Sequence, residues 1–166
     1  WRGYYIEFKV WWVGVVASLI IAFFSMGYVP VIFMGTIAST FMVRQRLGEF
    51  RYGYSFGQNA TVTNWGIVAN IYLATFFAFF LYFFPESHIL KIGMLMNLIM
   101  GVCQLIPLPW LEGLQIFFGS KSLYGGIWFY LLTISVLLLT GTRIGLIIAI
   151  LMEAAIAMFV VLWGDV

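Results

Sequence analysis

The chain has 166 residues, of which 64% are hydrophobic, 20% are aromatic and only 8% are charged. A globule of this length cannot bury so much apolar surface, so the lipid bilayer has to solvate it. A formal net charge of +2 is too small to indicate a nucleic-acid partner, and a single cysteine, Cys103, excludes an internal disulfide. The composition therefore predicts a single transmembrane domain over residues 1–166.

Runs without ionisable residues predict six transmembrane helices, since each crossing needs roughly 17–25 apolar residues. The run 10–43 is long enough for two helices, and residues 27–30 (GYVP) form the natural break between them. Residues 52–59 are too polar and glycine-rich to face lipid, so the third helix is expected after them. The expected spans are 10–27, 30–46, 64–84, 91–107, 125–141 and 143–163.

The distribution of lysine and arginine orients the predicted bundle. If both termini are cytoplasmic, six basic residues lie on the cytoplasmic side and only Lys91 and Arg143 lie outside. The six are Arg2, Lys9, Arg44, Arg46, Arg51 and Lys121. The sequence thus predicts an all-α, multi-pass protein of the cell membrane with N-in and C-in topology.

Polar segments recur between the apolar runs in a distinctive order. A basic segment over 44–51 precedes the glycine-rich polar stretch, residues 66–70 (GIVAN) open a helix, and a proline-stiffened turn over 105–113 (LIPLPWLEG) follows Asn97. This order of elements resembles the site-2 protease family, M50-like intramembrane zinc metalloproteases, over roughly residues 10–130. The resemblance implies a site-2-protease-like core within the six-helix bundle.

In that family, one helix carries the motif H-E-x-x-H, which supplies two zinc ligands and a general base. The matching positions here hold Thr36, Ile37 and Thr40. Threonine hydroxyls are poor zinc ligands and isoleucine cannot accept a proton, while the sole histidine, His88, is expected near the outer end of the fourth helix. The resemblance therefore implies a pseudoprotease with no catalytic residue, no metal and no other cofactor.

Three further residues correspond to positions of the family's site. Glu112 matches the aspartate that is the third zinc ligand, Gln104 matches an asparagine that precedes the prolines, and Asn70 matches an asparagine implicated in contacts with the substrate backbone. One oxygen ligand falls short of the roughly three protein ligands that catalytic zinc needs. Taken alone, Glu112 also fits an interfacial or capping carboxylate, and Asn70 fits a polar group that joins two helices.

Glu153 lies near the middle of the last expected span, with apolar residues on both sides. An ionised carboxylate at that depth costs roughly 2.5–3.5 kcal/mol or more, so the group should be protonated, paired or beside water. It fits either a neutral acid bonded to a neighbouring helix, or a contact with a partner subunit's cation or a proton path.

These observations predict a catalytically inactive, site-2-protease-like membrane protein that acts by binding. The small size and the lack of a soluble domain favour an accessory or structural subunit, packed against other transmembrane subunits and lipid. A regulator that binds transmembrane clients without cleaving them is a second possibility. A proton-coupled transporter that uses Glu112 and Glu153 is a third, and it requires a water path between the two carboxyl groups.

Overall fold

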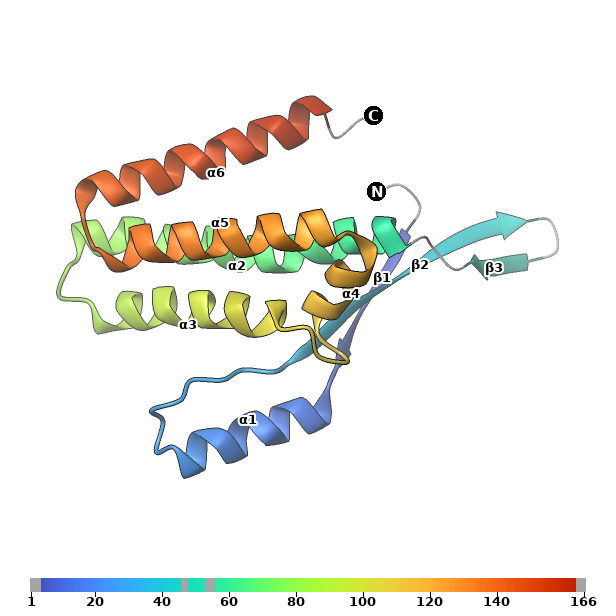
Figure 1. The fold of residues 1–166 in the computed structure, drawn as a ribbon, viewed down its shortest axis with the longest axis horizontal. Helices are drawn as coiled ribbons and strands as arrows, with labels where there is room; N and C mark the ends of the chain where they lie inside the picture. Colours follow the sequence, from blue (N-terminus) through green and yellow to red (C-terminus); the bar gives the residue numbers. More distant parts are fainter. Residues whose placement is uncertain (1–3, 46–47, 53–55, 164–166) are drawn as a thin grey trace.

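The structure, a computed structural model, describes residues 4–45, 48–52 and 56–163, with side chains over 7–37 and 56–158. This part of the chain is mostly helical and also contains one three-stranded sheet (Figure 1). The elements in chain order are β1 (Tyr4–Val10), α1 (Trp12–Phe24), β2 (Gly35–Gln45), β3 (Gly48–Tyr52), α2 (Phe56–Phe83), α3 (His88–Leu105), α4 (Glu112–Gly119), α5 (Lys121–Leu139) and α6 (Arg143–Trp163). Among the described residues, α2, α3 and α5 are long and apolar enough to cross a membrane.

The helix α2 is the centre of the bundle, since it packs against α3, α4, α5 and α6. Ile67 and Ile71 of α2 are fully buried in a core that also contains Leu131 and Ile134 of α5. The helix α6 lies over α2 and α5, and its fully buried Ala149 belongs to the same core. Helices are therefore present where the sequence predicts the last four spans, although α2 begins eight residues earlier than expected.

The segment 30–46 is not the expected helix, and the prediction of an all-α fold is wrong here. Residues 35–45 form β2, the middle strand of an antiparallel sheet of order β1-β2-β3. The strand opens at Gly35, where a Cβ atom would lie 2.1 Å from the carbonyl oxygen of Lys9 on β1. An apolar, uncharged run fits a strand as well as a helix, and the β-branched side chains of β2 favour the strand.

The helix α1 is also shorter than the expected span 10–27. Its 13 residues extend about 20 Å, less than the roughly 30 Å of a bilayer core. It ends at Phe24, and the chain then turns at Met26 and Gly27, which adopt positive φ angles of 50° and 81°. In Figure 1, α1 stands apart from the bundle formed by α2 to α6.

The chain returns from α1 to the sheet through residues 28–34, which form neither helix nor strand. The backbone N–H of Phe33 donates to Ser18 Oγ on α1 at 2.9 Å. The N–H of Ile32 donates to Cys103 Sγ on α3 at 3.5 Å. This segment therefore links α1 to the bundle.

Candidate functional site

The proline turn over 106–111 joins α3 to the short helix α4. The helix α3 ends at Leu105 because Pro107 disfavours a helical Ile106, which is extended at φ −63° and ψ 131°. Trp110 has a positive φ of 69°, which turns the chain back towards the bundle. As a result, Leu111 and Glu112 are buried at the start of α4.

Gly113 permits a close approach between α4 and the end of α3. A Cβ atom at this position would lie 2.2 Å from the carbonyl oxygen of Leu105 and 2.8 Å from that of Ile106. Both contacts are with backbone atoms, which cannot move aside as a flexible side chain can. A glycine directly after Glu112 is therefore a packing requirement of this turn.

The carboxyl group of Glu112 is buried, with only 1% of the residue exposed. It packs against Gly66 of α2, where a Cβ atom would lie 2.6 Å from Glu112 Oε1. Among the described residues, Glu112 Oε2 has no hydrogen-bond partner. Burial raises the pKa of Glu112 to about 8, because the charged form loses its hydration, so the neutral acid dominates at pH 7.

Asn70 lies one helical turn beyond Gly66 on α2 and meets Gln104 of α3. Its Nδ2 donates to Gln104 Oε1 at 2.8 Å. The structure thus brings together two of the residues that the sequence predicts for the site. This hydrogen bond between two side-chain amides crosses the α2–α3 interface, which fits the interpretation of Asn70 as a polar group that joins two helices.

Thr36 reaches the same region through Gln115, which lies three residues after Glu112 on α4. Gln115 Nε2 donates to Thr36 Oγ1 at 2.7 Å. Gln115 Oε1 accepts from Asn59 Nδ2 at 2.7 Å and from Thr63 Oγ1 at 3.1 Å. Gln115 and Thr63 are not among the residues predicted for the site, and Asn59 was expected to precede the third helix. The four-residue spacing of Asn59 and Thr63 is nevertheless that of one helix face.

The zinc motif H-E-x-x-H requires a helix, whereas residues 36–40 form part of the strand β2. On a helix, residues four apart have Cβ atoms about 5–6 Å from each other, whereas on a strand they are separated by roughly 13 Å. Thr36 and Thr40 therefore do not occupy the positions of two ligands on one helix turn. Ile37 is half-buried and follows Thr36 on the alternating strand, while the side chain of Thr40 lies outside the described part.

Removal of the Thr36 hydroxyl tests the hydrogen bonds around Gln115. Thr36→Val leaves one amide hydrogen of Gln115 without its acceptor, so we expect the free energy of unfolding to fall by about 1–3 kcal/mol. The matched control is Thr133→Val on α5, where an exposed hydroxyl bonds only to the Phe129 carbonyl of its own helix. Thermal unfolding in detergent compares them, and equal stability of both variants would contradict the predicted role.

Glu153 of α6 turns towards α2 of its own chain. Its Oε1 accepts a hydrogen bond from Thr75 Oγ1 at 2.5 Å, and its backbone carbonyl accepts from Tyr72 Oη at 2.9 Å. The residue is buried. This geometry fits an acid bonded to a neighbouring helix better than one exposed to the cation of a partner subunit.

The two buried carboxyl groups lie at different depths. Glu112 packs at Gly66 and Glu153 at Thr75, and these positions on α2 are about 14 Å apart along the helix axis. In the described part of the chain, two of the cavities, of about 440 and 510 Å³, include neither carboxyl group in their linings. The geometry therefore gives no support to a proton path that uses both groups.

The arrangement around α4 combines a neutral acid with amide and hydroxyl groups that bond to one another. Within the described ranges, no three histidine, cysteine, aspartate or glutamate side chains are grouped so that they could hold a metal ion. Comparison of the chain with protein-family models, with curated proteins and with solved structures gives no match.

Proposed function

We propose that this chain is a catalytically inactive, multi-pass protein of the cell membrane that serves as an accessory subunit of a larger membrane complex. The order of its polar segments over roughly residues 10–130 resembles the site-2 protease family, and the bundle α2 to α6 supplies the membrane spans. The sheet, α4 and Lys121 belong to the cytoplasmic side, whereas Lys91 and Arg143 belong to the opposite side. This orientation keeps the charge asymmetry predicted from the sequence.

The lack of catalysis is supported by the hydrogen bonds at the α4 site. The amides of Asn70, Gln104 and Gln115 bond to partners within the chain, as does the Thr36 hydroxyl. Among the described side chains of this arrangement, Glu112 is the one ionisable group, and a single carboxyl group supplies neither a zinc site nor an acid and base pair. The polar groups of the site thus serve to pack α2, α3, α4 and β2 together.

The observation that carries the subunit role is the uncovered surface of α1 and residues 28–34. Side chains of α1 such as Phe23 and Phe24 are more than 80% exposed. Tyr28, Val29 and Pro30 are also exposed, and their backbone belongs to neither helix nor strand. Lipid cannot hydrogen-bond to an irregular backbone, so such a segment is tolerated at membrane depth only where protein or water covers it. A transmembrane partner packed on this surface would cover both features.

Site-specific photo-crosslinking tests this role. A photoreactive phenylalanine analogue at Phe23 of α1 should give one discrete adduct with another membrane protein in the native membrane. The matched control is the same analogue at Phe129 of α5, since Phe129 is 73% exposed and Phe23 is 81% exposed. Phe129 should yield no protein adduct. Adducts of equal yield from both positions, or none from Phe23, would contradict a partner on α1.

A further inference from the structure

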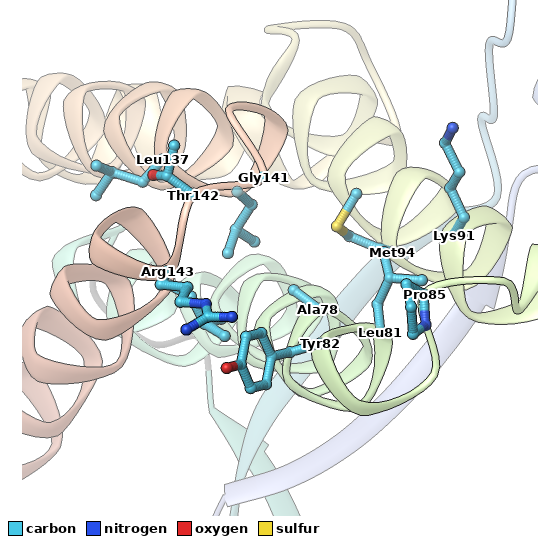
Figure 2. A pocket seen from close by; sticks show the side chains of 12 residues that line it. Ala78, Leu81, Tyr82, Pro85, Lys91, Met94, Leu137, Gly141, Thr142 and Arg143 are labelled. Atoms are coloured by element: carbon cyan, nitrogen blue, oxygen red, sulfur yellow. The ribbon is translucent and has the colours of Figure 1, made fainter.

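A cavity lies at the end of the bundle opposite to the α4 site, between α2, α3, α5 and α6. Its volume is about 440 Å³. Figure 2 shows that the turn from α5 to α6 lies on one side of the cavity and that α2 and α3 lie on the other. The apolar part of its lining includes Ala78, Leu81, Met94, Leu137, Leu138 and Leu146. This part could accommodate a hydrocarbon chain.

Two cations contribute to the lining of the same cavity. Arg143 is the first residue of α6, and its guanidinium carbon lies 5.4 Å from the centroid of the Tyr82 ring. Figure 2 shows Arg143 and Tyr82 side by side, and Lys91 on α3 with its amino group turned outwards at the rim. Among the described residues, neither cation forms an ion pair with a carboxylate.

The cavity is positively charged, although it lies at the end of the bundle where basic residues are few. In the proposed orientation it opens on the side away from the cytoplasm, where basic residues are disfavoured, yet it carries both cations expected there. The guanidinium carbon lies over the Tyr82 ring, and a cation–π contact of this kind leaves the N–H donors of the arginine available to oxygen atoms. Arginine edges bind phosphate through charge-assisted hydrogen bonds, which are stronger than neutral ones.

We propose that this cavity binds an anionic phospholipid, with the phosphate at Arg143, Lys91 at the rim and part of an acyl chain along the apolar wall. Basic pockets between transmembrane helices recognise lipid head groups through the same combination of charge and apolar contact. The proposal depends on the membrane location and orientation of the bundle, but not on the partner at α1. Loss of one binding event would therefore leave the other intact.

Native mass spectrometry of the purified full chain tests the site. With matched acyl chains, phosphatidylglycerol should remain bound at higher occupancy than phosphatidylcholine. Arg143→Gln should weaken phosphatidylglycerol binding about tenfold, which corresponds to about 1.4 kcal/mol, and Lys91→Gln should have a smaller effect. Lys121→Gln is the matched control, because this lysine begins α5 at the other end of the bundle, and it should bind lipid as the unchanged chain does.

Three results would overturn the proposal. They are equal occupancy by the two lipids, unchanged binding by Arg143→Gln, and displacement of the lipid by inorganic phosphate at the lipid concentration, which would indicate a soluble-anion site. Thermal unfolding checks that Arg143→Gln is folded. If it is not, Arg143→Lys and the comparison of the two lipids on the unchanged chain still decide the matter, because a charge-selective site retains part of its preference with lysine.

Discussion

Gly113→Ala is expected to destabilise the protein by about 3 kcal/mol or more, at the upper end of the range for overpacked sites. The added methyl group would lie 2.2 Å from the Leu105 carbonyl oxygen, and its neighbours are backbone atoms that can move only if α4 separates from α3. That separation would also withdraw Glu112 and Gln115 from their contacts with α2 and β2. Unfolding of the full chain in detergent, followed by circular dichroism, measures the loss.

Gly125→Ala is the matched control for this prediction. Gly125 lies within α5, and a Cβ atom there would meet nothing within 4 Å. Alanine has the higher helix propensity, so this change should be neutral or stabilise by up to about 1 kcal/mol. Similar unfolding midpoints for both alanine variants would show that α4 does not pack against α3 as described.

The free energy of unfolding of the unchanged protein is expected to fall as the pH rises, and Glu112→Gln is expected to abolish this decrease. Burial raises the pKa of folded Glu112 to about 8, whereas an unfolded chain releases this proton near pH 4.5. Between these values the folded state binds more protons, so stability falls by up to about 1.4 kcal/mol for each pH unit and then levels off. Glutamine cannot ionise, so the variant's stability advantage should grow by more than about 2 kcal/mol from pH 5 to pH 9.

Glu86→Gln provides the control for this pH dependence. Glu86 is exposed on the turn between α2 and α3, away from the buried site. Its substitution removes one carboxyl group without touching the contacts of Glu112, so it should not reproduce the stability advantage of Glu112→Gln. Parallel stability curves for Glu112→Gln and the unchanged protein would mean that Glu112 is hydrated or ionised in the folded state.

The helices of the bundle could be predicted because a membrane-spanning segment has to be long, apolar and nearly free of charge. A span needs a long run without charge, and the ends of such runs predict helices close to α2, α3, α5 and α6. The same criterion failed over 30–46, since it measures apolarity and not conformation. The strand β2 depends on pairing with β1, about 30 residues away in sequence, and no local pattern specifies that contact.

The orientation predicted from the charges does not depend on this error. A helix pair over 10–46 would cross the membrane twice, and its replacement by α1 and a strand removes both crossings. In the proposed orientation, the start of α2 therefore stays on the cytoplasmic side. The sheet, α4 and the start of α5 lie towards one end of the bundle, and the starts of α3 and α6 lie towards the other (Figure 1).

At the α4 site, the local part was predictable and the long-range part was not. The proline turn indicates that Glu112 lies close to the end of α3, and Gln104 lies one residue before that end. The bonds of Gln115 to Asn59 and Thr36 depend on how α4 docks between α2 and β2, which the spacing of residues along the chain does not reveal. Thr36 does reach the site, but it lies on a strand and is joined to the site by a hydrogen bond from the side-chain amide of Gln115.

The proposal that this chain is a subunit is tested most directly by its oligomeric state and its partners in the native membrane. Gentle extraction followed by native mass spectrometry of the intact assembly measures that state. We expect the chain in a complex of fixed stoichiometry with at least one other transmembrane protein, and without bound zinc. Recovery of the chain alone, or with one zinc ion per chain, would contradict the account.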